Sequence, residues 1–173
     1  KHDSIETQLK LKYQEEIKGK SESEISEIYY QNLLSRSKNN RERLDHYFSA
    51  VQTYLETQKL IGPSQEAAQQ EIPDKTANYS QGFPALYKEV HDFIKNRYQD
   101  RLDEYFTKSA KIHFIVQNDH SLYIEKVEGT EKEFNDLALL AFLMTTGKWE
   151  SAFQRGMNVK SKFVLPVKFV VEE

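Results

Sequence analysis

The spacing of the apolar residues changes along the chain, and the change falls at Gly62-Pro63. Before this dipeptide, apolar residues recur three or four positions apart, as they do on one face of a helix. After it, two stretches alternate apolar and polar residues, as strands with one buried face do. Because proline cannot continue a helix, a helical region should end here. The spacing therefore predicts an α+β protein in which helices precede a mixed domain.

We predict a helical region over residues 1–62, a linker over 63–78 and a mixed domain over 79–173. The region from Lys1 to Leu60 is rich in good helix formers and contains a single glycine and no proline. Its most regular apolar stripe consists of Leu44, Tyr47, Phe48, Val51, Tyr54 and Leu55. Residues 37–40 separate this stripe from earlier ones, so we expect two or three helices.

The mixed domain should begin with a helix over residues 83–98, in which Pro84 is tolerated in the first turn. Residues 110–116 and 122–127 then read as strands, and the polar turn between them predicts a β-hairpin.

A second helix is expected after the hairpin. Thr130 and Glu133 have the spacing of a capping box, in which each side chain bonds the other residue's backbone amide. Gly147 is placed to end this helix.

The last predicted strand spans residues 160–171 and has the clearest alternation. One face carries Phe163, Leu165, Val167, Phe169 and Val171, and the other carries Lys162, Val164, Pro166, Lys168 and Val170. We expect the first face to be buried.

Trp149 and one group of aromatic residues have competing interpretations. Trp149 should cover the core between sheet and helices, and contact with a partner is the alternative. The group could line a peptide groove between helices, but we favour packing within the helical region itself. Its members are Tyr29, Tyr30, Tyr47, Phe48 and Tyr54.

Several classes of function have little support in the sequence. The chain has 24 basic and 27 acidic side chains without long runs of one sign, which does not favour a nucleic-acid surface. It has no cysteine, and its five histidines form no His-Glu-x-x-His motif. We therefore predict a protein that is not an enzyme, with no catalytic residues, no metal site and no cofactor.

Four segments of the second half resemble one known family, in that family's order. They are Tyr79-Ser-Gln-Gly82-Phe83, the hairpin 114–122, Lys148-Trp149-Glu-Ser-Ala152, and Gly156-x-x-Val159 followed by Phe163-Val-Leu-Pro166-Val-Lys-Phe169. Together they resemble the TonB C-terminal domain. The chain departs from that pattern at Gln81 and His120, where the family usually has glycine, at Ser151, where it has proline, and at Glu125, where it has an apolar residue.

The resemblance implies a helix, a β-hairpin, a second helix and a last strand, with a three-stranded antiparallel sheet. It also implies a periplasmic domain of Gram-negative bacteria that captures the TonB box of outer-membrane transporters. Such a transducer couples inner-membrane energy to outer-membrane transport, and it would carry a membrane anchor before Lys1 that joins a complex driven by the proton-motive force.

The expected binding mode is strand addition to the last strand, because an edge strand exposes unpaired amide and carbonyl groups. The candidate partner-binding residues are Lys160, Lys162, Val164, Lys168 and Val170. The lysines could instead protect the edge against unwanted pairing. A homodimer through the same edge is an alternative partner.

An alternative hypothesis for the function assumes the same fold without a transducer role. The region 1–62 looks like folded helix rather than an extended spacer, and the chain has only four prolines. An envelope adaptor or lipoprotein-like protein that binds partners through these helices is the alternative.

Overall fold

The computed structural model describes residues 2–63, 72–97 and 108–168. Its contacts divide the chain into a first unit, residues 1–50, and a second unit, residues 51–173. The helices are α1 (His2–Glu16), α2 (Glu22–Ile61), α3 (Phe83–Arg97) and α5 (Lys132–Leu143). The strands are β1 (Asn78–Tyr79), β2 (Ser109–Val116), β3 (Leu122–Gly129), β4 (Trp149–Glu150), β5 (Ala152–Gln154), β6 (Met157–Val159) and β7 (Ser161–Lys168). The predicted α+β class is confirmed.

Helix α2 is continuous through residues 37–40, so a helix boundary there, which the sequence left open, is wrong. The polar residues at these positions are tolerated within a helix because they include good helix formers such as Lys38. The helix starts with a reciprocal capping box. The Ser21 amide donates to the Glu24 carboxylate at 3.0 Å, and the Glu24 amide lies 3.5 Å from the Ser21 hydroxyl.

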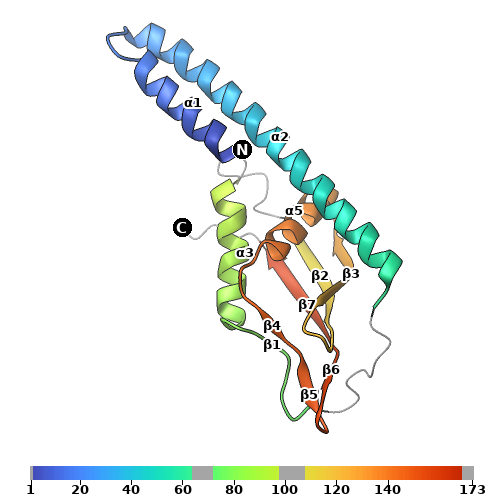
Figure 1. Ribbon diagram of the computed structural model, residues 1–173. Helices are drawn as coiled ribbons and strands as arrows, with labels where there is room; N and C mark the ends of the chain where they lie inside the picture. Colours follow the sequence, from blue (N-terminus) through green and yellow to red (C-terminus); the bar gives the residue numbers. More distant parts are fainter. Residues whose placement is uncertain (1, 64–71, 98–107, 169–173) are drawn as a thin grey trace. The chain divides into compact units, whose positions relative to one another are not determined.

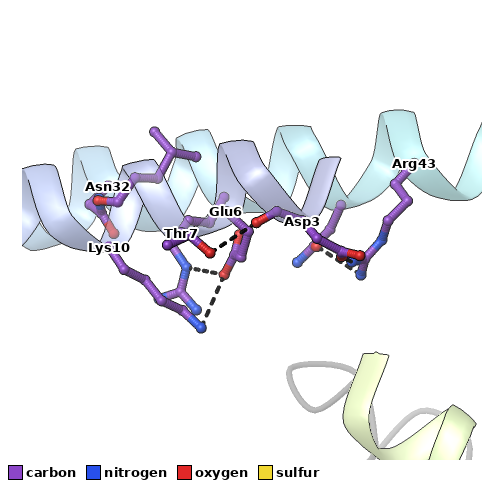
Figure 2. Close-up of polar contacts among 9 residues, drawn as sticks. Asp3, Glu6, Thr7, Lys10, Asn32 and Arg43 are labelled. Carbon is purple, nitrogen blue, oxygen red and sulfur yellow. Dashed lines mark hydrogen bonds and ion pairs between the residues drawn. The ribbon is translucent and has the colours of Figure 1, made fainter. Parts of the chain in front are cut away.

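Polar contacts join α1 to the first part of α2 (Figure 2). The Arg36 guanidinium donates to Glu6 at 2.7 Å, and Arg43 donates to Asp3 at 3.0 Å. The Asn32 amide donates to the Leu9 carbonyl at 2.7 Å. These contacts and the half-buried apolar stripe of α1 hold the two helices of the first unit together.

The aromatic group of the helical region does not form the internal core that we expected. Tyr29 and Tyr30 are 53% and 55% exposed, although the Tyr29 ring also meets Tyr13 edge-on at 5.9 Å. Tyr47 and Phe48 are half-buried. A helix in a two-helix pair can bury only one stripe, so the apolar residues outside that stripe stay in solvent. No helix in the described ranges combines the length and apolar character that crossing a membrane requires.

The second unit contains an antiparallel sheet with strand order β3-β2-β7 (Figure 1). The predicted hairpin is confirmed as β2 and β3. The last strand is confirmed as β7 over residues 161–168, and residues 169–171 of the prediction lie outside the described residues. On β2 the expected face is buried, with Ile112, Phe114 and Val116 at most 1% exposed. The register of β2 and β3 shifts between His113 and Phe114, and Glu125 is the extra residue of this bulge.

Helices α5 and α3 cover one face of this sheet (Figure 1). Helix α5 packs on β2 and β3, and α3 packs against α5. Trp149 is 8% exposed and meets the Phe114 ring at 5.3 Å, which confirms its predicted place in the core. Phe163 of β7 stacks on Phe114 at 5.6 Å from the same face.

Two local predictions around α5 are wrong. Glu131, not Thr130, is the N-cap residue, and no side chain caps this end of the helix. The helix also ends at Leu143, before Gly147. Gly147 instead lies against the Tyr79 ring, which a β-carbon on residue 147 would approach to 2.2 Å. Close packing, not helix termination, accounts for this glycine.

Short strands complete the second unit. β1 pairs with β4, and β5 pairs with β6. Within the segment predicted as a linker, the Lys75 amide and carbonyl exchange hydrogen bonds with Phe153 at 3.1 and 2.8 Å. Residues 64–71 of that segment lie outside the described residues.

Candidate functional site

Strand β7 is an edge of the sheet. Within the described part of the chain it pairs with β2 alone, in an unbroken register from Ser161 opposite Val116 to Lys168 opposite Ser109. Its side chains alternate as predicted. Leu165 and Val167 are buried, whereas Val164 is 50% exposed and Lys162, Pro166 and Lys168 are exposed.

The proline in β7 indicates which backbone groups face the open edge. Residues of an antiparallel strand alternate between those bonded to the neighbour and those whose N–H and C=O point away from it. Pro166 lies opposite Lys111 and has no N–H to donate, so it belongs to the outward-pointing set. Val164 and Lys162 lie two and four residues before Pro166, so they belong to the same set. Their amide and carbonyl groups therefore face the side away from β2.

The candidate residues from the sequence do not all have the same environment. The Lys162 ammonium lies 3.1 Å from the Glu125 carboxylate, so the bulge residue of β3 reaches across β2 to the edge strand. Lys160 lies between the ends of β6 and β7 in the sequence and is half-buried. Val170 lies outside the described residues. The structure thus places Lys162, Val164 and Lys168 on β7, and Lys160 directly before that strand.

The opposite edge of the sheet is covered at Leu122 and Ile124. The Gln58 side-chain amide donates to the Ile124 carbonyl at 2.5 Å, and the Ile124 amide donates to the Gln58 carbonyl oxygen at 3.0 Å. This pair of bonds copies what a neighbouring strand would make with β3. Tyr54, one turn earlier on α2, directs its hydroxyl to the Leu122 carbonyl at 3.5 Å, and burial raises the pKa of this tyrosine. No pattern in the sequence points to Gln58, because its role depends on tertiary contact.

A serine–histidine contact lies beside the hairpin turn. The Ser151 amide donates to Nδ1 of His120 at 2.9 Å, and the Ser151 hydroxyl donates to the Gln117 carbonyl at 2.5 Å. A nucleophilic serine needs a base that is placed to take its hydroxyl proton. Here that proton is held by a carbonyl and Nδ1 already accepts an amide, so the contact favours a structural role.

A second, half-buried network joins α3 to the loop after α5. The Tyr79 hydroxyl donates to Glu89 at 2.6 Å, and the amides of Thr146 and Gly147 donate to Glu89 and to the Tyr79 oxygen at 2.9 and 2.7 Å. The hydrogen bond from Tyr79 holds the pKa of Glu89 below its usual range, and burial raises the pKa of Tyr79. All donors and acceptors here satisfy one another, so this network stabilises the fold.

Among the residues that the structure describes, no group of three or more His, Asp or Glu side chains is placed to hold a metal ion. Comparison with known proteins found no matching family model, no matching curated protein and no matching solved structure. The geometry of the β7 edge therefore carries the functional argument.

Proposed function

We propose that the second unit is a protein-binding module that captures an extended peptide by adding it as a strand to β7. The observation that carries this proposal is the contrast between the two edges of one sheet. Gln58 occupies the amide and carbonyl groups of Ile124 on β3, whereas Lys162 and Val164 direct theirs away from β2. An edge of this kind is a template for β-strand addition.

The resemblance to the TonB C-terminal domain supports a partner for this edge. We propose the TonB box of an outer-membrane transporter, met in the periplasm, with coupling of inner-membrane energy to transport as the biological role. The order of helix, hairpin, helix and edge strand is compatible with this proposal. Lys162 and Lys168 would face a segment that carries acidic side chains.

The first unit favours a second candidate, an envelope adaptor that uses the same fold without transducer activity. Helices α1 and α2 are joined by the ion pairs of Glu6 with Arg36 and of Asp3 with Arg43, so this unit is a folded helical pair and not an extended spacer. In this reading the helices of the first unit bind the partner.

The test of the first candidate is an amide NMR titration of the chain with TonB-box peptides from the transporters of its source organism. We expect chemical-shift changes concentrated in residues 160–168. Val164→Pro removes an outward amide without breaking a bond to β2, and it should weaken binding at least about tenfold. Val164→Thr keeps the amide and should bind as the unchanged chain does.

Two results would contradict the proposal in different ways. Unaltered affinity of Val164→Pro would show that β7 is not the docking edge. No shifts at about millimolar peptide would contradict the transporter role and favour the adaptor, and the search for partners would then turn to the helices of the first unit.

A further inference from the structure

A groove of about 400 Å³ lies between α3 and the end of β7. Both walls belong to the second unit. Its lining comes from one face of α3 and from the last residues of the edge strand, namely Tyr87, Val90, His91, Ile94, Pro166, Val167 and Lys168. A space of this size is within the range of sites that hold small apolar groups.

The groove has an apolar floor and a partly polar rim. Val90, Ile94 and Val167 contribute to its lining and are at most 5% exposed, so they form the floor. Tyr87 is 43% exposed, and Lys168 is exposed as well. A large aliphatic side chain that entered the groove would exchange water for these apolar surfaces.

The groove begins where the edge of β7 loses a hydrogen-bond donor. A strand added beside Lys162 and Val164 can exchange backbone bonds with both residues. At Pro166 no amide is available, and backbone pairing weakens there. Because Pro166 is also the first β7 residue of the groove lining, side-chain contacts can take over at this point.

The charges of the lining favour an acidic ligand. His91 and Lys168 lie in the lining, and no carboxylate is among the described residues that form it. The nearest carboxylate on this turn of α3 belongs to Asp92, whose side chain lies 3.8 Å from His91 and pairs with Lys88. Among the lining residues that the structure describes, no carboxylate therefore cancels the attraction of Lys168 for an anion.

From these observations we infer a sequence preference of the captured peptide. The segment that adds to β7 carries a large aliphatic side chain that enters the groove between α3 and β7, next to a carboxylate that pairs with Lys168. This inference rests on the proposed function, because it takes the β7 edge as the docking site. It goes further by naming the side chains that select one extended segment over another.

The probes are synthetic peptides of about eight residues, which is within the usual range of strand lengths, with alternating Thr and Val. One peptide ends in Leu-Asp, a second in Ala-Asp and a third in Leu-Lys. Each is also made with this pair at the amino end, since a strand can add in either direction. Affinities are measured by NMR titration of the full chain, and sedimentation reports whether the chain self-associates.

The Leu-Asp peptide should bind about tenfold more tightly than the Ala-Asp peptide, as expected for burying a few methylene groups. Tyr87→Ala should remove this difference. Lys168→Glu should weaken the Leu-Asp peptide and strengthen the Leu-Lys peptide, which a change in stability alone would not do. Lys148→Glu is the matched control, because hydrogen bonds to Ser80 place Lys148 beside the other end of α3, and it should leave all affinities unchanged.

The failures of the two proposals are distinguishable. If all peptides bind equally and Val164→Pro abolishes their binding, strand addition stands and the preference is wrong. If Val164→Pro has no effect while the Leu and Asp preferences persist, the groove binds its ligand without strand addition. If the chain self-associates through β7 and excludes every peptide, a second copy is the occupant and the inference is overturned.

Discussion

At the scale of single residues, His120 and Ser151 show how two unusual choices support one another. His120 has a φ of 71°, in the left-handed region where glycine is normally found. Its Nδ1 accepts the Ser151 amide, and its own amide lies 3.2 Å from the Ser151 oxygen. The TonB pattern has glycine and proline at these two positions. A glycine would lack the acceptor and a proline would lack the donor, so the two departures act as a pair.

A double-mutant cycle tests this coupling. Ser151→Pro alone should lower the free energy of unfolding by about 1–3 kcal/mol, because it removes the amide that His120 Nδ1 accepts and the hydroxyl that bonds the Gln117 carbonyl. His120→Gly loses the same bond but relieves the backbone, so its cost should be smaller.

The double variant should be more stable than the sum of the single effects predicts, by about 1 kcal/mol. Chemical denaturation of the four proteins gives these values. Additive effects would show that the two residues do not depend on each other.

At the scale of elements, a side chain near the end of α2 makes the backbone hydrogen bonds to β3 that a neighbouring strand would make. Gln58 is half-buried and pairs with both backbone groups of Ile124. A further strand could not pair with Ile124 while this amide side chain is bound to it. This is why only one edge of the sheet is proposed as a docking site.

Gln58→Leu should leave the amide and carbonyl of Ile124 without protein partners. We expect the free energy of unfolding to fall by about 1–2 kcal/mol and the Ile124 amide to exchange faster with solvent. Gln52→Leu makes the same change at an exposed position of α2 and is the control. Hydrogen exchange with NMR detection compares the protection of the Ile124 amide in the two variants. Unchanged protection of Ile124 in Gln58→Leu would contradict the capping role.

The sequence could predict the longer strands but not the shortest ones. The alternation in 110–116 and 163–168 predicted β2 and β7, because a strand with one buried face imposes a period of two on the sequence. Strands of two or three residues, such as β1 and β4, are too short to show a period.

Local signals were reliable only where tertiary contacts agreed with them. Ser21 and Glu24 form a capping box in the structure, whereas the matching pair Thr130 and Glu133 does not. At the second site, the helix begins after Glu131, which pairs with Lys108 at 3.1 Å. The candidate residues on β7 could be found from alternation, but the cap by Gln58 and the groove beside α3 depend on contacts between distant segments.

At the scale of the whole molecule, the contacts divide the chain within helix α2. Contacts separate residues 1–50 from residues 51–173, and α2 contributes to both units. The first unit is held by polar contacts between α1 and α2, and the second by an aromatic core under the sheet. Because these sources of stability share few residues, we expect the two units to open separately.

Arg43→Met tests this independence. Arg43 is 8% exposed and bonds Asp3 and Asn40, so its loss should loosen α1 from α2. We expect the amides of α1 to exchange about fivefold faster, which corresponds to about 1 kcal/mol of local stability, since the Asp3 partner is exposed and its ion pair weak. The amides of β2 should keep their protection. Arg41→Met, at an exposed position two residues earlier, should change neither. Equal acceleration in α1 and β2 would show that the chain opens as one cooperative unit, and a partner bound to the helices could then act on the β7 edge through global stability alone.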